Sequence, residues 1–410
     1  MTAHPPSDAA SPAGEAFRRE VRAWLAREIP DHLKGRRDNL AMPLRHSTLA
    51  DLLARAPQWR PVLDALERRG WLAPAWPREH GGAGFDAEQL FAFDAEWLAA
   101  GLPPLGSDGL DKVGPTLIAA GTPAQQRRFL DPTRRREIVW AQGYSEPGAG
   151  SDLAHLTLRA DRVPGGFRLT GRKTWTSNAH LADWLYVLGR TDAAARPAHA
   201  GISLFLVDAR SPGLSIRPII GIDGYHHLNE TTFEEVFVPE AQVVGGLNEG
   251  WRVANILLGH ERFTHPSVNP VYHDHALGEL KRFARSAGER ATLPWDDAGL
   301  RRTIAALEAD IDDLRTARRR AQVHFIRTGR PGPETSIFKL WGGALMQRII
   351  EAHHALVGPA GLAWEAEPFG EAARDLARRS TRVRAYSISG GTREVQRNIV
   401  ARRVLGLPGR

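Results

Sequence analysis

The chain has 410 residues, of which 42% are hydrophobic and 25% charged, a composition typical of a globular protein with two or three domains. It contains no cysteine, which excludes disulfides, thiolate metal sites and a cysteine nucleophile, and no apolar run approaches the roughly 18 residues of a membrane helix. The formal net charge is +7, but basic and acidic residues are interspersed along helical stretches such as 308–320, which favours solvated helix faces over a nucleic-acid-binding surface.

The first 14 residues lack the apolar core of a signal peptide, so we expect a short disordered lead-in and a cytoplasmic protein. From 15 to 137 the period is helical. Phe17, Val21, Trp24 and Leu25 recur at helical spacing, and the same pattern returns at 59–66. This region is predicted to be an N-terminal all-α domain.

The period becomes alternating in the second part, 138–246. Leu156, Leu158 and Ala160 alternate with polar residues, and the turn at 164–166 precedes a second alternating run, as in a hairpin. Further short strands are expected at 184–188, 202–207 and 233–238. Short strands separated by Gly/Pro turns predict a small middle β-barrel domain.

The helical period returns over 247–410. Apolar stripes at 304–314 and 340–352 are typical of long amphipathic helices in a four-helix bundle. Thr392 is a candidate N-cap for the last helix, which should end near Gly406. The predicted fold class is therefore α+β and multidomain.

Three short segments carry the chemistry: residues 144–152, 173–178 and 389–397. The first combines glycines, a proline and hydroxyls, as in a polar ligand cradle. The second places Trp175 beside a hydroxyl and an amide, which suits a flat heteroaromatic ring; the alternative is a tryptophan in the barrel core. The third offers backbone amides at the start of a helix. His226 and His227 are adjacent on a predicted strand and point to opposite faces, so no metal site is expected.

In their order and spacing these segments resemble the acyl-CoA dehydrogenase family of flavoproteins, from about residue 71 to the C-terminus. Locally, 142–152 and 259–262 are most similar to bacterial members that act on large or functionalised acyl chains, including pimeloyl-CoA dehydrogenase-like large subunits. The resemblance implies three domains (helical, β-barrel, four-helix bundle) and an FAD cofactor. Its implied FAD-binding residues are Gln142, Tyr144, Ser145, Gly150, Ser151, Trp175, Ser177, Gly391, Thr392 and Glu394.

The family pattern is broken at the expected catalytic base. Many members carry a glutamate immediately before the Gly-Thr pair, and here that position is Gly390, which can still supply its backbone amide to the thioester oxygen. A second family location lies on the first long C-terminal helix before an arginine, and here it holds Glu261 and Arg262. The resemblance therefore implies Glu261 as the base, with Ser151 and Arg262 near the substrate. Pro266 predicts a kink just beyond Glu261.

The leading hypothesis is α,β-dehydrogenation of an acyl-CoA to the trans-2-enoyl-CoA by a cytoplasmic enzyme of fatty acid metabolism. The resemblance implies electron-transfer flavoprotein as acceptor and a homodimer or homotetramer, with a heterotetramer as the alternative. Two other functions remain open: a non-catalytic partner subunit of a heteromeric dehydrogenase, and a basic family member that binds nucleic acid.

Overall fold

The computed structural model describes residues 11–34, 47–261, 268–286, 294–328, 332–368 and 370–408. The chain divides into two compact units, each described by itself. The β unit comprises Ala10–Ile220 and His226–Glu261, and the helical unit comprises Gly221–Tyr225 and Arg262–Arg410 with Met1–Ala9. Most of the lead-in expected over 1–14 lies outside the described residues, and the first helix begins at Pro12.

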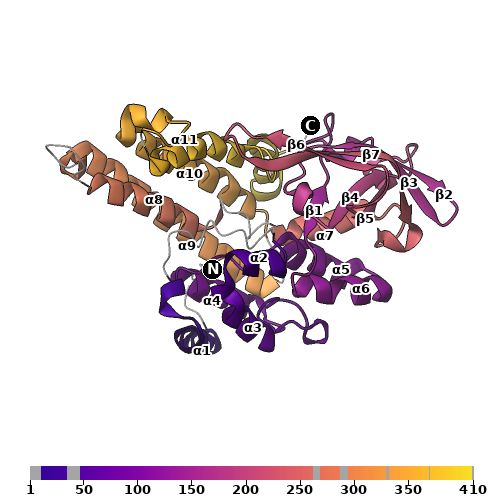
Figure 1. The fold of residues 1–410 in the computed structure, drawn as a ribbon, viewed down its shortest axis with the longest axis horizontal. Coiled ribbons are helices and arrows are strands. Elements are labelled where there is room, and N and C mark those ends of the chain that lie inside the picture. Colours follow the sequence, from indigo (N-terminus) through magenta and orange to yellow (C-terminus); the bar gives the residue numbers. More distant parts are fainter. Residues whose placement is uncertain are drawn as a thin grey trace. The chain divides into compact units, whose positions relative to one another are not determined.

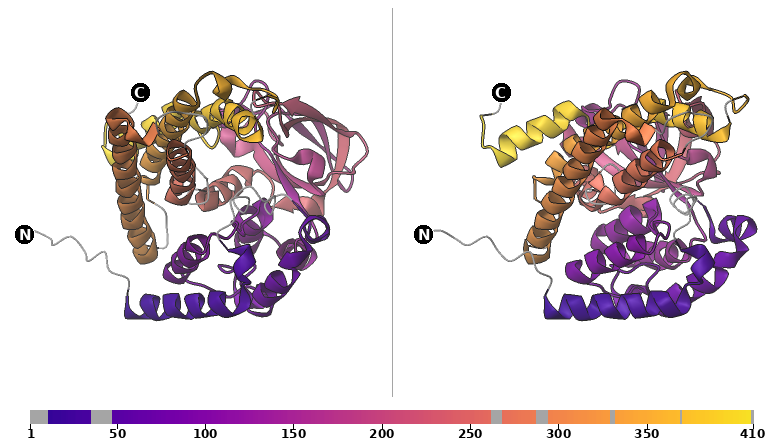
Figure 2. Two further views of the ribbon diagram at one scale, coloured as in Figure 1. Left: turned by 60° about the vertical axis from the view of Figure 1, so that its left-hand side comes forward. Right: turned by 90° about the vertical axis from the view of Figure 1, so that its left-hand side faces the viewer.

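The β unit begins with helices that pack around large aromatic side chains. Trp71 lies 4.8 Å from Trp24 and 5.3 Å from Phe93 between ring centroids, and all three side chains are buried. Ser11 and Thr122 cap two of the helices by accepting backbone hydrogen bonds. The first helix is the indigo one at the foot of both views in Figure 2. The bounds are α1 Pro12–Glu28, α2 Leu49–Arg55, α3 Arg60–Arg68, α4 Ala87–Ala99, α5 Gly114–Ala120 and α6 Pro123–Arg134.

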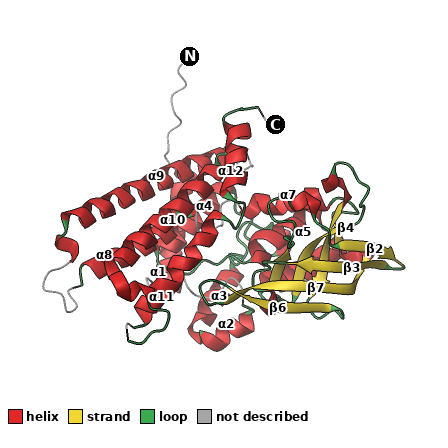
Figure 3. Cartoon of the chain, turned by 90° about the horizontal axis from the view of Figure 1, so that it is seen from above, coloured by secondary structure: helices red, strands yellow, loops and turns green. Residues whose placement is uncertain are grey.

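The middle of the chain forms one eight-stranded sheet. Its path runs β6-β7-β3-β2-β4-β5-β8, with β1 paired to β4, and the order β4, β2, β3, β7, β6 can be followed along the yellow strands of Figure 3. The bounds are β1 Trp140–Gly143, β2 Arg159–Val163, β3 Gly166–Lys173, β4 Trp184–Arg190, β5 Ile202–Asp208, β6 Leu214–Ile220, β7 His226–Pro239 and β8 Val243–Val244. This sheet forms the middle β domain, which the sequence predicts to be a small barrel.

The predicted hairpin is confirmed. Strands β2 and β3 are antiparallel, with Val163 opposite Gly166 and Ala160 opposite Leu169. The inward face carries Phe167 and Leu169, both buried. Strand β7 is longer than the predicted 233–238, and it pairs with both β3 and β6. The sequence reading missed β6 because its residues are mostly exposed and lack a clear apolar alternation.

The helix α7 (Gly250–Glu261) closes the β unit. Val253, Ala254 and Leu257 are buried in the same apolar cluster as strands β4 and β5, whereas Leu258 is exposed. The residues that follow, including Arg262 and Pro266, lie outside the described ones. The next helix starts at Pro270, in the first turn, where a proline is tolerated because its missing N–H has no partner there anyway.

The helical unit is built on long helices, as the apolar stripes predict. Ile304, Leu307, Ile311 and Leu314 are buried on α9 and pack in one cluster with Leu345 and other residues of α10. Thr392 caps the last α-helix by accepting a hydrogen bond from Val395 N at 3.3 Å, which confirms the predicted start. The helices are labelled in Figure 1. The bounds are α8 Pro270–Ala284, α9 Ala298–Thr328, α10 Thr335–Val357, α11 Glu371–Arg382 and α12 Arg393–Ile399.

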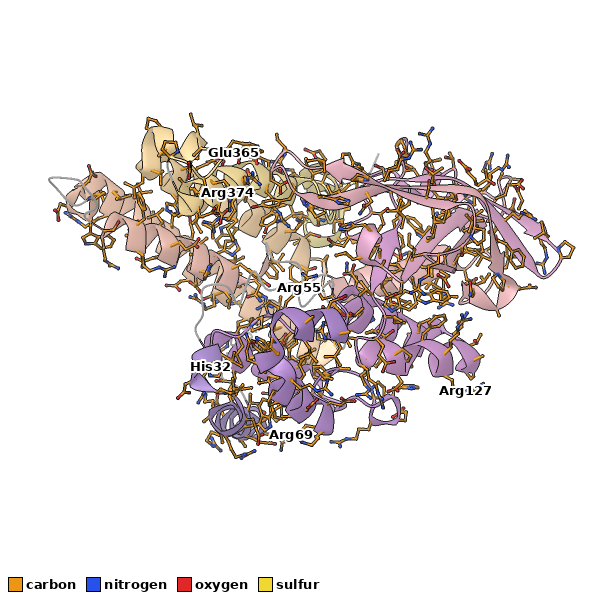
Figure 4. All side chains as sticks on the ribbon, viewed as in Figure 1. His32, Arg55, Arg69, Arg127, Glu365 and Arg374 are labelled. Carbon is orange, nitrogen blue, oxygen red and sulfur yellow. The ribbon has the colours of Figure 1, made fainter. Side chains whose placement is uncertain are left out.

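Surface charge follows the expected solvated pattern. Figure 4 labels Arg55 on α2, Arg127 on α6 and Arg69 directly after α3, and each of these side chains is exposed. The Arg69 guanidinium lies over the Trp71 ring and forms an ion pair with Glu20 at 3.0 Å. Among the described helices, none is long and apolar enough to cross a membrane.

Candidate functional site

The first two motifs, residues 144–152 and 173–178, are joined by buried hydrogen bonds. Lys173, the last residue of β3, is fully buried, and its Nζ donates to Glu146 Oε1 at 2.7 Å and to the Tyr144 carbonyl oxygen at 3.1 Å. One residue on, Thr174 N donates to the Ser145 carbonyl oxygen at 2.9 Å. Residues 144–152, which we call the glycine cradle, are therefore fixed to the start of the tryptophan motif.

The Glu146 carboxylate accepts more than the lysine. It accepts hydrogen bonds from Thr157 N at 2.6 Å, Thr157 Oγ1 at 2.7 Å and Leu158 N at 2.9 Å. Burial would raise the pKa of Glu146, but the ammonium of Lys173 and these hydrogen bonds outweigh it and hold the pKa below its ordinary value. The sequence contained a signal for this pair, since Lys173 falls on the inward-facing phase of β3 and a buried lysine needs a partner.

Above this pair the cradle is open. A Cβ added at Gly148 or Gly150 would meet nothing within 4 Å, and both glycines are exposed, as is Ser151. Gln142 is half-buried in β1 opposite Tyr186. The Tyr144 ring is 6% exposed and packs edge-on against Tyr186 at 5.8 Å, so this residue belongs to the core beneath the cradle.

Trp175 projects from the sheet. Its side chain is 58% exposed, so the alternative of a core tryptophan is wrong. Its φ is 59°, in the left-handed region that aromatic residues rarely adopt, and Asn178 has a φ of 55°. Between them Thr176 is fully buried and Ser177 is exposed. An exposed indole on a strained turn, beside an open glycine cradle, is the surface that a flat aromatic ligand requires.

The third motif belongs to the helical unit. Gly390 and Gly391 have φ values of 66° and 94°, and Thr392 begins α12. Gln396 Nε2 donates to the Gly390 carbonyl oxygen at 3.2 Å, which ties the glycine turn to the helix. Glu394 is exposed, and hydrogen bonds from its own backbone N–H and from the Thr392 hydroxyl lower its pKa.

The catalytic and substrate residues expected from the sequence are only partly described. Glu261 is the last residue of α7, and its side chain lies outside the described part of the structure, as does the whole of Arg262. Gly390 is exposed. No group of three or more His, Asp or Glu side chains that could hold a metal occurs among the described residues.

His226 has a neighbour that the sequence did not indicate. Its ring stacks on that of His180, with centroids 3.9 Å apart, and buried Asn229 lies within hydrogen-bond distance of both imidazoles. His180 and Asn229 are 49 positions apart, so no spacing pattern in the sequence indicates that they meet. Only the pairing of β3 with β7 brings them together.

Comparison with known proteins places these features in a family. Family models of the acyl-CoA dehydrogenase N-terminal, middle and C-terminal domains match residues 11–137, 141–236 and 248–405. The chain belongs to the acyl-CoA dehydrogenase family. It is an enzyme of that class, an oxidoreductase, and the expected order of helical, β and helical parts is confirmed.

Individual relatives support the assignment. The chain is 36% identical over 404 residues to the acyl-CoA dehydrogenase IpdE1 of Mycobacterium tuberculosis, covering 96% of this chain and 98% of that protein. Among solved structures, the Tcur3481-Tcur3483 steroid ACAD matches with a TM-score of 0.78 and 29% identity over the whole of both chains. The ChsE4-ChsE5 complex from M. tuberculosis matches with a TM-score of 0.76 and 29% identity, covering 98% of this chain and 99% of that chain.

Proposed function

We propose that this acyl-CoA dehydrogenase binds FAD and converts an acyl-CoA thioester into its trans-2-enoyl-CoA. One observation carries the proposal: the open glycine cradle and the exposed Trp175 both adjoin the buried ion pair of Lys173 and Glu146. This ion pair holds the backbone of the cradle and the indole as a fixed surface, which favours a rigid, flat cofactor.

The residues present fit FAD. The open space at Gly148 and Gly150 lets a backbone approach a ligand closely, and the Trp175 ring is available for stacking. We assign to this cofactor Ser145, Gly150, Ser151, Trp175 and Ser177 from the β unit, with Gln142 and Tyr144 behind them. Gly391, Thr392 and Glu394 would contribute from the helical unit. FAD, when bound, supplies a hydride acceptor for the β-hydrogen.

Glu261 is proposed as the base that removes the substrate α-proton. No carboxylate stands at the alternative family position, which is Gly390, and the glycine there keeps its backbone N–H available to polarise the thioester oxygen. Ser151 and Arg262 are assigned to the substrate side. Removing a proton at one carbon while hydride leaves the next requires both groups to be held in place, which is the positioning effect of this site.

The substrate class is proposed to be a large, ring-containing acyl-CoA. The Tcur3481-Tcur3483 steroid ACAD is similar along the whole chain, and its name gives two components, as does that of the ChsE4-ChsE5 complex. We therefore favour a heterotetramer with a second acyl-CoA dehydrogenase chain over a homodimer or homotetramer. Electron-transfer flavoprotein is the proposed acceptor and the cytoplasm the proposed compartment.

The test is a screen of acyl-CoA thioesters against the purified, FAD-loaded protein under anaerobic conditions. Straight-chain, branched and steroid-side-chain thioesters are added, and loss of the visible flavin absorbance is followed. Bleaching by a ring-containing thioester, with an enoyl-CoA product by mass spectrometry, is expected. A folded protein that takes up no FAD contradicts the proposal. Bleaching only after a second family chain is added would identify this chain as one subunit of a heteromeric enzyme.

A further inference from the structure

The Trp175 turn is strained, and something must hold it. On the N-terminal side of Trp175, Lys173 lies opposite Thr231 of β7. On its C-terminal side, Thr176 N donates to the Asn229 carbonyl oxygen at 3.0 Å and Asn178 N donates to the His227 carbonyl oxygen at 2.8 Å. The pairing with β7 is therefore shifted by one residue across Trp175. Trp175 is therefore the extra residue of a bulge, and bulges re-aim side chains. Left-handed backbone at such a residue persists only where its surroundings enforce it.

Asn229 supplies that enforcement from both its backbone and its side chain. Besides accepting from Thr176 N, it donates from Nδ2 to the Thr176 carbonyl oxygen at 2.9 Å. Both backbone polar groups of the residue after Trp175 are thus held by one fully buried asparagine. Because a carbonyl oxygen only accepts, this contact also fixes which side of the amide carries the nitrogen.

The orientation of the amide in turn fixes the two histidines. The second N–H of the amide faces His180 Nδ1 at 3.2 Å, so that nitrogen must accept and His180 carries its proton on Nε2. The amide oxygen faces His226 Nε2 at 2.8 Å, so that nitrogen must donate. Burial and the neighbouring charge of His226 lower the pKa of His180, which agrees with the neutral form that the hydrogen bond needs.

We propose that Asn229, held by the stacked pair of His180 and His226, is a positioning residue that keeps Trp175 exposed and ready to bind the flavin. The inference rests on the proposed FAD site. Its consequence is that the turn is preorganised before the cofactor arrives, so that binding does not have to order it. Every hydrogen-bonding group of the Asn229 amide is used, and removing the donor leaves the Thr176 carbonyl oxygen facing another oxygen.

The test compares variants chosen by which atom they keep. Asn229→Asp keeps size and the acceptor for His226 but removes both donors. His180→Leu removes the acceptor for Asn229, whereas His180→Asn places an amide oxygen near the former Nδ1 and serves as the matched control. His180 is exposed, so its substitution leaves the fold intact even if Asn229→Asp does not fold. Two readouts are taken: FAD affinity of the apoprotein, and amide hydrogen exchange over 174–179 without FAD.

We expect Asn229→Asp and His180→Leu to raise the FAD dissociation constant about threefold to tenfold, the range for loss of one buried hydrogen bond, and to speed exchange at Thr176. His180→Asn should restore both. Wild-type affinity and wild-type exchange in His180→Leu would overturn the inference. If wild type binds FAD but no thioester bleaches it, the proposed dehydrogenation is wrong, while the FAD affinities of the variants still test the role of Asn229. A wild type that binds no FAD overturns both.

Discussion

Lys173 and Glu146 form an ion pair at 2.7 Å in which the side chains are 0% and 3% exposed, and it joins the glycine cradle to β3, the strand that ends two residues before Trp175. Two charges out of contact with water are stable only together. Loss of one partner leaves the other buried and uncompensated, and the three further hydrogen bonds that Glu146 accepts make its position the more rigid of the two.

Lys173→Met should therefore lower the free energy of unfolding by about 3–5 kcal/mol, because the Glu146 carboxylate loses its counterion inside the protein. Urea unfolding followed by tryptophan fluorescence measures it. The matched control is Arg172→Met on the same strand, whose side chain is exposed and whose loss should change stability by less than about 0.5 kcal/mol. Equal effects of the two substitutions would show that the ion pair does not hold the motifs together.

Trp175→Ala should separate binding from folding. Since the indole is 58% exposed, its removal should change the unfolding free energy by less than about 0.5 kcal/mol, yet weaken FAD binding about tenfold by loss of ring stacking. Equilibrium titration of the apoprotein with FAD measures the second effect. Phe237→Ala, which removes a 45% exposed aromatic from β7, is the control and should bind FAD normally. An unchanged affinity of Trp175→Ala for FAD would show that the indole does not contact the cofactor.

The pH dependence of the helical unit should reflect His353. This side chain is buried on α10, and burial, together with the nearby charge of Arg379, lowers its pKa to about 4. The contribution of a histidine that the fold keeps neutral to the free energy of unfolding is fully present above its unfolded pKa. This contribution is lost as the pH falls from about 6.5 towards 4, by up to about 3 kcal/mol.

Substitution of His353 tests this prediction. His353→Leu should flatten the loss of stability between pH 6.5 and 4, measured as urea midpoints at several pH values. His324→Leu replaces an exposed histidine on α9 and should leave the slope as in wild type. A wild-type slope in His353→Leu would show that other groups control acid unfolding.

The fold order and the hairpin followed from periodicity alone, because those elements bury one face and show it in the sequence. The long-range features did not. The pairing of Asn229 with the residue after Trp175, and the stacking of His180 on His226, depend on which strands become neighbours. The left-handed φ of Trp175 was likewise hidden, since tryptophan carries no signal for it. The role of Glu261 as the base stays a prediction.

A carboxylate at the other family position should not be tolerated well. Gly390 has a φ of 66°, where a side chain costs about 1–2 kcal/mol, so Gly390→Glu should destabilise the protein and give little rescue of a variant that lacks its base. Gly390→Asn is the control, because asparagine accepts left-handed backbone more readily, and its urea midpoint should stay closer to that of wild type. Substantial rescue of Glu261→Gln by Gly390→Glu would contradict this argument.

The most direct measurement is anaerobic stopped-flow reduction of the bound flavin by a thioester that bleaches wild type, comparing wild type with Glu261→Gln. The amide keeps the size and polarity of the side chain and removes its basicity. FAD content and circular dichroism should match wild type, while the rate of reduction should fall by roughly 10²–10⁴-fold. A variant that reduces its flavin as fast as wild type would contradict the assignment of Glu261 as the base.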